Sequence, residues 1–542
     1  MGGPRATANR YNFAVAFFVA LGSFTYGFNS SIIGAVIGQP SFYTYFDFTP
    51  ETSYGGSIIG ASNGVYAGAG VIGCWTVFWL LDMLGRKRAI QVIAVICIVS
   101  AAIQAGSVHI GMFLVGRGLN GLGVGFINCA VPTYISEISP PGQRGRIVGS
   151  HGFIICTAYG IAGWCGFGTY YEDNPQIQWR LLVALQIVAP LLLFIGSPWV
   201  PESPRWLINK QRDQEGLAVL EKLHAHPNDP DHASAKEEFL QVQRQLAFER
   251  TQEIPNFFQL VVGKKYRKRM FIGFYVQAMA QSTGVLVGDP DSSYYGKTDH
   301  RAKVISNYMV LELNTLGVTG STPLLVLAFY NSWAAVLNYI NALLIDRIGR
   351  IRIITIGLTG CIVCLIIVTA LNAQFAGTDN KAGQAAAIAF MFLFVTFYGF
   401  GIDVSSYVYC TEIFPTQIRS KGTGWSVSGL FLMTTIYTTA AGPAFNAIDW
   451  KYYLVFIIVT SLMLPYAALK FPETKGLSLE EIGALFGDEV VLDYNNLSEE
   501  EKKALDERVA ASTDAAIIEK GTTDDRSSND EKAGGNSVER LS

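Results

Sequence analysis

Residues 82–86 read Asp-Met-Leu-Gly-Arg, and residues 346–350 read Asp-Arg-Ile-Gly-Arg. Each stretch follows a long segment without charged side chains, and the two lie 264 positions apart. A glycine permits a tight turn between two helices, and the flanking charges favour the edge of a membrane over its interior. The repeat therefore predicts two homologous halves, each built from membrane-spanning helices.

Two further charged motifs repeat between the halves at similar offsets of 275 and 271 positions. The first further motif is Glu137 with Arg144, which recurs as Glu412 with Arg419. The second is Pro-Glu-Ser-Pro-Arg at 201–205, which recurs as Pro-Glu-Thr-Lys at 472–475. Together with the Asp-x-x-Gly-Arg repeat, three motifs recur in the same order, which supports an internal duplication.

Segments free of Asp, Glu, Lys and Arg recur twelve times along the chain. Each is close to or above the roughly 18 to 20 residues that a spanning helix needs. We therefore predict an all-α polytopic membrane protein, with twelve transmembrane helices in two pseudo-symmetric six-helix bundles. The segments are 11–46, 52–81, 89–116, 118–136, 147–171, 181–201, 270–288, 313–345, 353–378, 382–402, 422–448 and 452–469.

The composition of the 542-residue chain agrees with this class, because 50% of the residues are hydrophobic and only 15% are charged. A soluble protein normally carries about a quarter of its residues as charged ones, so the composition excludes a disordered chain and argues against a soluble enzyme. The net charge of -3 is unevenly distributed along the chain. Residues 473–542 hold 18 acidic and 8 basic side chains, so the acidic tail offsets a basic body.

Lys and Arg concentrate in alternate connections between the predicted helices, which places both termini and the central loop in the cytoplasm. The predicted parts are a cytoplasmic N-terminus (1–10), an N-terminal six-helix bundle (11–201), a cytoplasmic central loop with short helices (202–269), a C-terminal six-helix bundle (270–470) and an acidic cytoplasmic tail (471–542).

The repeated motifs place opposite charges at the cytoplasmic ends of helices in both halves. Such pairs can latch the bundles together when the protein is closed inside and separate when it opens. Alternatively, the charges only orient loops, but the positive-inside rule requires Arg and Lys and no recurrent carboxylates. The predicted cytoplasmic gate consists of Asp82, Arg86, Glu137, Arg144, Glu202, Arg205, Asp346, Arg350, Glu412, Arg419 and Glu473.

These motifs resemble those of the sugar-porter family of the major facilitator superfamily, and the pattern is most like its fungal branch. The resemblance spans about residues 12–485 and also rests on Gly-Arg-Gly-Leu-Asn-Gly-Leu-Gly at 116–123, Pro-x-Tyr-x-x-Glu at 132–137 and Glu-Ile-Phe-Pro at 412–415. It implies that the protein moves a sugar, by default a hexose, or a related polyol across a membrane by alternating access.

The resemblance places the substrate pocket mainly on helices 7, 10 and 11, where the chain departs from the family pattern. Ala280 replaces the first residue of a typical Gln-Gln pair, and Gly152 stands where helix 5 usually supplies a Gln. Fewer side chains than usual are therefore available to form hydrogen bonds with a hexose. The predicted substrate contacts are Gln281, Tyr308, Asp403, Tyr407 and Phe431.

Two polar residues inside predicted helices bear on energy coupling. Asn29 stands where proton-driven members of the resembled family typically carry Asp, close to Arg117. Because Asn does not titrate, we predict downhill facilitated diffusion. The alternative is proton symport that uses Asp403, since a carboxylate inside a span is costly and usually functional. A structural hydrogen bond or exposure to an outer vestibule would also explain Asp403, and His151 is interpreted as a hydrogen-bonded structural histidine.

Residues 288–304 form a polar run of seventeen residues in the expected middle of helix 7. Its Lys297, Arg301 and Lys303 cannot lie in hydrocarbon. Deleting the run restores a continuous apolar helix. We therefore hypothesise that this anomalous insertion is an unspliced intron of 51 nucleotides retained by gene prediction, and an unusual outer loop is the alternative.

Other function classes agree less well with the sequence. A non-transporting nutrient sensor would suit the thinned pocket and the acidic tail, but the tail shows no repeated motif. No nucleophile–base pair or phosphate loop indicates an enzyme, and the eight cysteines predict no disulfide or metal cluster. We expect a monomer in the lipid bilayer of the plasma membrane, without cofactor, metal or nucleic acid. Its partners would be the sugar or polyol and, under the symport alternative, protons.

Overall fold

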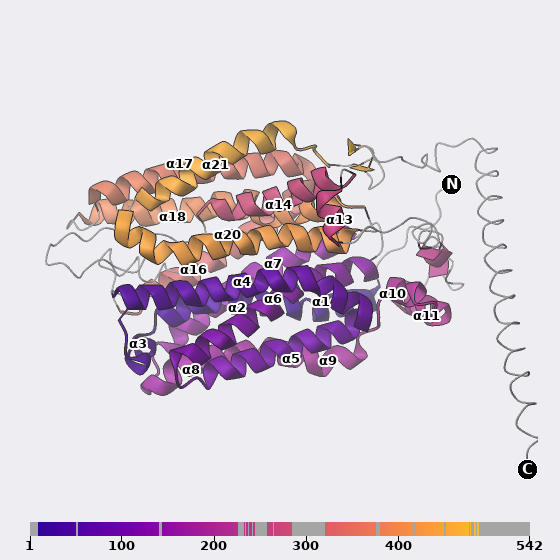
Figure 1. Cartoon of the computed structure of the whole chain (residues 1–542), viewed down its shortest axis with the longest axis horizontal. Coiled ribbons are helices and arrows are strands. Elements are labelled where there is room, and N and C mark those ends of the chain that lie inside the picture. The colour runs from indigo at the N-terminus through magenta and orange to yellow at the C-terminus, as the bar shows by residue number, and fades with distance from the viewer. Residues whose placement is uncertain are drawn as a thin grey trace, which may run out of the picture. The chain divides into compact units, whose positions relative to one another are not determined.

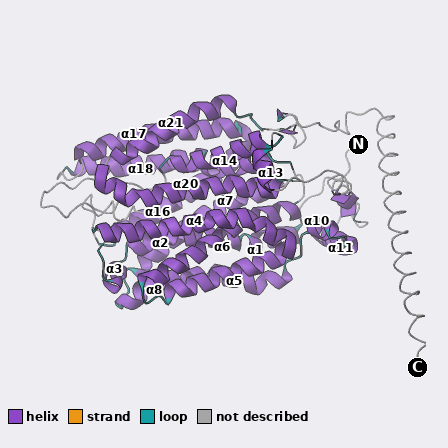
Figure 2. Ribbon diagram, viewed as in Figure 1, coloured by secondary structure: helices purple, strands orange, loops and turns teal. Residues whose placement is uncertain are grey.

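Every regular element in the described part of the chain is a helix (Figure 2). The fold class predicted from the sequence, an all-α polytopic membrane protein, is therefore confirmed. The structure is a computed structural model that describes residues 9–486, apart from 50–51, 140–143, 226–231, most of 233–256, 264, 285–319, 376–379, 416–417, 449–450, 476, 478–481 and 484.

The helices of the N-terminal half lie together in the lower part of Figure 1, in indigo to magenta. The first predicted segment forms three helices, and the sixth is interrupted by one short 3-10 turn (Leu185–Ile187) and ends in another (Ser197–Trp199). These helices are α1 (Arg10–Val19), α2 (Leu21–Ile37), α3 (Pro40–Phe46), α4 (Ser53–Leu84), α5 (Arg86–Ala105), α6 (Ile110–Ile138), α7 (Arg144–Thr169), α8 (Pro175–Ala184) and α9 (Val188–Gly196).

The helices of the C-terminal half occupy the upper part of Figure 1, in pink to yellow. The tenth predicted segment is followed by a break at Ile402 and a further helix. These helices are α14 (Arg267–Ser282), α16 (Thr322–Ile348), α17 (Arg350–Phe375), α18 (Lys381–Gly401), α19 (Asp403–Glu412), α20 (Arg419–Ile448) and α21 (Tyr452–Lys470). Between the halves lie α10 (Pro204–Asn209), α11 (Asp213–His224) and α13 (Phe257–Val262).

Each of the twelve predicted segments overlaps a helix or a run of helices. Ten helical stretches in the described residues are long and apolar enough to cross a membrane. The remaining two predicted segments correspond to α14 and α20. Several helices begin at a basic residue that the charge-free segments excluded, namely Arg86, Arg350 and Arg419, because a charged side chain in the first turn can reach the membrane interface.

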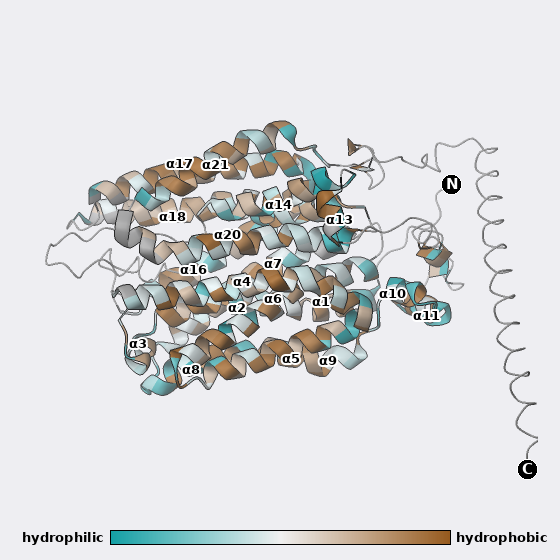
Figure 3. Cartoon of the chain, viewed as in Figure 1, coloured by the Kyte–Doolittle hydropathy of each residue, from teal (hydrophilic) through white to brown (hydrophobic). Residues whose placement is uncertain are grey.

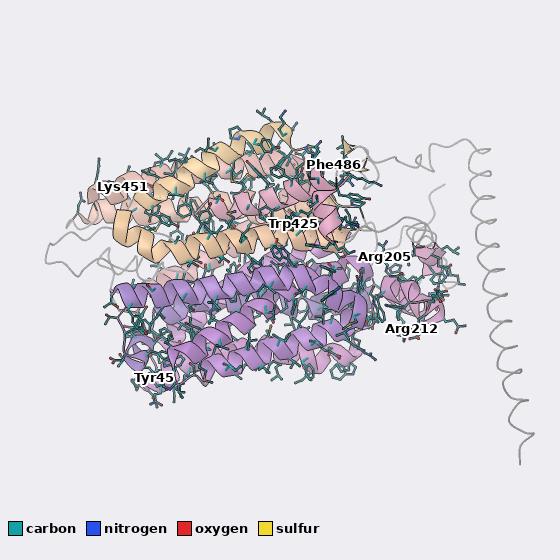
Figure 4. All side chains as sticks on the ribbon, in the orientation of Figure 1. Tyr45, Arg205, Arg212, Trp425, Lys451 and Phe486 are labelled. Carbon is teal, nitrogen blue, oxygen red and sulfur yellow. The ribbon has the colours of Figure 1, made fainter. Side chains whose placement is uncertain are left out.

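The two halves meet along two pairs of long helices, α4 with α20 and α7 with α16. Small residues allow this approach: the backbone at Gly163 lies against Ala328, and Gly64 lies against Thr439. Trp425, labelled in Figure 4, stacks on Trp75 across the first pair, with ring centroids 6.2 Å apart. The seam between the halves is therefore packed along the middle part of α4, from Gly64 to Trp75.

The outward faces of the long helices are apolar (Figure 3). Large side chains such as Phe17, Trp79, Trp199 and Leu469 are at least three-quarters exposed. Exposed apolar surface of this extent on spanning helices is surface that faces lipid. Both halves belong to one compact unit, Met1–Ile482, and Gly483–Ser542 form a second unit.

Candidate transport site

The turn between α4 and α5 is held by a carboxylate from the end of the N-terminal half. Gly85 has φ +83° and ψ 170°, a conformation that is nearly restricted to glycine. Glu202 Oε1 accepts hydrogen bonds from the backbone N–H groups of Arg86 at 2.8 Å and Lys87 at 3.1 Å. The carboxylate thereby caps the unpaired N–H groups at the start of α5, where the helix dipole favours negative charge.

The C-terminal half repeats this turn between α16 and α17. Gly349 has φ +109°, and Glu473 accepts from the backbone N–H groups of Arg350 at 2.8 Å and Ile351 at 3.0 Å. Glu473 is therefore part of the compact unit that ends at Ile482, although the sequence placed it in the acidic tail.

Each half also contains an arginine–carboxylate pair beside its turn. Arg86 donates through Nε and Nη2 to the two oxygens of Glu137, each at 2.8 Å. Arg350 makes the same two-pronged contact with Glu412 at 3.0 and 2.7 Å. Bidentate pairs of this kind are stronger than single hydrogen bonds, so each joins two helix ends of its half firmly.

These contacts bear on one part of the predicted gate. Asp82 lies 3.5 Å from Arg86, and Asp346 lies 2.8 Å from Arg350, in each case four residues earlier in the chain and across the glycine turn. The partners of both arginines among the described residues thus come from the same half. In this structure the pairs on Arg86 and Arg350 therefore lie within one half and do not latch one bundle to the other. A role for these charges in a gate stays a prediction.

The other basic residues of the predicted gate give less information. Arg144 begins α7, and its side chain lies outside the described part of the chain. Arg419 begins α20 and donates through Nε to the carbonyl of Phe414 at 3.4 Å. Arg205 lies on α10 and is half-buried. A role for these three residues in a gate stays a prediction.

Asp403 lies at the junction of the two halves. It begins α19 directly after the break at Ile402, and its carboxylate accepts from the thiol of Cys156 on α7 at 3.2 Å. Asn338 of α16 donates to the same sulfur at 3.1 Å and also hydrogen-bonds to Asp403. A half-buried carboxylate thus connects one helix of the N-terminal half with two helices of the C-terminal half.

The aromatic residues predicted as substrate contacts pack against the N-terminal half. The Phe431 ring lies edge-on to Tyr26, with centroids 6.2 Å apart, and fits where Gly70 has no side chain. The Tyr407 ring lies edge-on to the imidazole of His151, with centroids 6.1 Å apart. Tyr407 also lines a cavity between the halves, where an aromatic face can cover the C–H face of a sugar. Phe431 is 2% exposed and packs in the hydrophobic core.

A chain of hydrogen bonds starts at α2 and crosses from the N-terminal half to α19. Ser23 Oγ lies 2.6 Å from His151 Nδ1, and His151 Nε2 lies 3.2 Å from Asn128 Oδ1. Asn128 Nδ2 donates to the Tyr407 hydroxyl at 3.1 Å. The chain borders a cavity between the halves. Its lining comprises Asn128, Pro132, His151, Gly152, Val404, Tyr407, Val408, Thr411 and Thr423.

Arg117 of α6 is buried beside Asn29 of α2. Its Nη1 donates to the backbone carbonyl of Asn29 at 3.3 Å, and its guanidinium carbon lies 4.2 Å from the centre of the Tyr66 ring. Nε and Nη2 of Arg117 and both polar atoms of the Asn29 side chain have no hydrogen-bond partner among the described residues. The cation is stabilised by an aromatic face and a carbonyl, and no carboxylate of the described chain pairs with it.

The remaining predicted contacts lie on the seventh predicted helix. Gln281 is buried on α14, and its side-chain carbonyl oxygen has no partner among the described residues. Tyr308 and the insertion 288–304 lie outside the described residues. The substrate contact at Tyr308 and the intron hypothesis therefore stay predictions, and sequencing of the transcript tests the second: a message that retains the 51 nucleotides would contradict it.

Sequence reasoning missed the polar residues that complete the cavity. Asn128 and Thr423 lie in segments without charge, and Thr411 directly precedes Glu412. All three are neutral, whereas the prediction rested on ionisable and family-matched positions. The hydrogen bonds expected for His151 are present, but the residue also lines the cavity. An uncharged amide inside the glycine-rich segment 116–131 was the signal that could have identified Asn128.

A sequence profile described as "Sugar (and other) transporter" matches residues 15–486. The chain belongs to this family. Among its relatives, the MFS-type transporter criB of Aspergillus cristatus is 32% identical and aligns over 91% of this chain and 96% of its own length. The quinate permease of Neurospora africana is 28% identical over 93% and 96%, and the high-affinity glucose transporter of Kluyveromyces lactis is 26% identical over 89% and 86%.

Solved structures agree on the fold. The proton:xylose symporter XylE bound to 6-bromo-6-deoxy-D-glucose superposes with a TM-score of 0.71 at 20% identity, over 88% of this chain and 99% of that chain. The predicted membership of the sugar-porter family, and with it the function class of a multi-pass membrane transporter for sugars, is confirmed.

Proposed function

We propose that this sugar transporter moves a hexose or a related polyol down its gradient, without coupling to protons. Relatives named as glucose transporters and quinate permeases support a ring-shaped, hydroxyl-rich substrate. Tyr407 and Phe431 would cover its apolar faces, and Gln281 offers a buried carbonyl that lacks a partner among the described residues. Tyr308 is proposed to complete this set.

The observation that carries the proposal is the environment of Arg117. Proton coupling at this place needs a group that changes its charge. Arg117 contacts the backbone carbonyl of Asn29 and the face of Tyr66, and the side chain of residue 29 is an amide instead of a carboxylate. An amide can accept from a guanidinium but cannot release a proton. Residue 29 therefore cannot take up and release a proton during transport.

The test uses intact cells of a transporter-deficient host in weakly buffered medium. We expect labelled sugar to equilibrate across the membrane while the pH of the medium stays constant. A panel of hexoses, pentoses, disaccharides and polyols identifies the substrate. Alkalinisation of the medium on addition of a transported sugar would contradict facilitated diffusion.

Proton symport through Asp403 is the second candidate, and the position of this carboxylate supports it. Asp403 bonds to Cys156 of the opposite half, so a change in its charge would act on the contact between the halves. Under symport, Asp403→Asn would keep downhill exchange and lose only accumulation against a gradient. Under facilitated diffusion, the same variant changes neither the final internal concentration nor its pH dependence.

We further propose a monomer in the plasma membrane with both termini in the cytoplasm. The basic residues at the starts of α5, α17 and α20 support this orientation. Tags at the two termini that become accessible to antibody only after permeabilisation would agree with it, and labelling of intact cells would contradict it.

A further inference from the structure

The cavity between the halves contains more hydrogen-bonding capacity than the protein itself uses. Thr423 of α20 is 5% exposed, and its hydroxyl has no partner among the described residues. A buried hydroxyl without a partner is less stable than one that is hydrogen-bonded, because it has lost its bonds to water and gained none in return. A free hydroxyl that lines a cavity is therefore a position where a polar ligand atom, or water, is favoured.

Asn128 lines the same cavity, and its neighbours fix which side-chain atom accepts a hydrogen bond and which donates one. Its Oδ1 can only accept, so His151 Nε2 donates to it and Nδ1 accepts from Ser23. The amide nitrogen has two hydrogens, of which one is directed to the Tyr407 hydroxyl. His151 thus orients an amide that has a second N–H to donate.

Gly152 of α7 lies on the same cavity, and Val404 of α19 packs closely against it, because a methyl group at 152 would approach the Val404 side chain to 2.9 Å. Gly152 stands where the resembled family usually has Gln. The chain therefore lacks that polar side chain on the cavity, and hydrogen bonds to a ligand there must come from other lining residues such as Asn128 and Thr423.

We propose that this cavity is a hydroxyl-binding subsite for the transported sugar or polyol, in which Asn128 and the Thr423 hydroxyl bind hydroxyl groups of the substrate. The inference rests on the proposed function. His151 acts as a positioning residue that holds the amide of Asn128. The same amide also donates to the Tyr407 hydroxyl of the other half, so substrate binding and the contact between the halves share one side chain.

The test compares a transported sugar with its monodeoxy analogues in reconstituted vesicles. Thr423→Val removes the hydroxyl at nearly constant shape, and Asn128→Leu does the same for the amide. For the parent sugar we expect KM to rise roughly 3- to 10-fold in each variant, as for the loss of one neutral hydrogen bond. For one deoxy analogue, which lacks the bound hydroxyl, each variant should show the same KM as the wild type.

Thr434→Val is the matched control, because Thr434 is equally buried on α20 but bonds to its own helix at Leu430 and does not line the cavity. It should leave the KM of every analogue unchanged. An equal KM shift for the parent and all analogues in Thr423→Val and Asn128→Leu, or no shift in correctly folded protein, would overturn the subsite. Failure of the wild type to transport any sugar would instead refute the proposed function.

Discussion

At the scale of single residues, the buried guanidinium of Arg117 is the most informative group. Removing an unpaired cation from water costs several kcal/mol, and the Tyr66 face returns only about 2 kcal/mol even when it is desolvated. The carbonyl and side chain of Asn29 provide the remaining polar surroundings. A carboxylate at position 29 would be the natural counter-ion, and its absence leaves the site without a titratable partner.

Replacing that amide tests the interpretation. Asn29→Asp should pair with Arg117 at neutral pH, and protonation of the new carboxylate in acid medium should break the pair. We therefore expect uptake by the variant to change several-fold between neutral and acid medium. Labelled-sugar uptake as a function of pH measures the effect. Asn29→Ser, which cannot titrate, is the control and should keep the wild-type profile; an unchanged profile for Asn29→Asp would contradict the assignment.

The sequence predicted charged site residues better than neutral ones. Arg86 with Glu137 and Arg350 with Glu412 could be selected because their charged motifs recur in both halves at the ends of charge-free segments. Whether such pairs lie within or between the halves depends on helix packing, which the sequence does not specify. Asn128 was missed because an amide in an apolar segment is compatible with many neighbours, and only the fold brings it to Tyr407.

At the scale of elements, the turns after α4 and α16 have the same structure, although only the Asp, Gly and Arg of the motif are identical in the two. In both, a glycine with positive φ allows a glutamate from the far end of the half to reach the start of the next helix. The repeated Asp-x-x-Gly-Arg sequence thus encodes a turn, a helix cap and an ion pair together. Its energetic role is to hold three helix ends of one half as a rigid group.

Substitution of either glycine should break this arrangement. A methyl group at Gly85 or Gly349 would lie 3.0 Å from the carboxyl carbon of Glu202 or Glu473, and the backbone conformation adds about 1–3 kcal/mol of strain. We expect Gly85→Ala and Gly349→Ala each to lower the thermal unfolding temperature of the detergent-solubilised protein by several degrees.

Gly111→Ala provides the control for this measurement. Gly111 lies on α6 with open space around its Cα, so alanine there should be neutral or slightly stabilising. Equal unfolding temperatures for the three variants would show that the turns contribute nothing specific to stability.

At the scale of the whole molecule, transport requires the two halves to separate alternately at each end of the seam. The contact between α4 and α20 extends from Gly64 and Thr439 near one end to Trp75 and Trp425 near the other. The twelve charge-free segments predicted the helices, but the seam could not be predicted, because small residues such as Gly64 are common on every helix.

A disulfide across one end of the seam should stop the cycle. A Cβ at Gly64 would lie 3.4 Å from the Cβ of Thr439, close to the separation of about 3.5–4.5 Å that a disulfide needs. The double variant Gly64→Cys with Thr439→Cys should lose most uptake under oxidation and regain it on reduction. Each single variant should be insensitive to the oxidant, and full activity of the cross-linked protein would contradict separation at this end.

The most direct test of facilitated diffusion is uptake by the purified protein in liposomes with and without an imposed proton gradient. Facilitated diffusion predicts that labelled sugar reaches the external concentration and stops there, whichever way the proton gradient is directed. Accumulation above the external concentration that collapses with the proton gradient would contradict it.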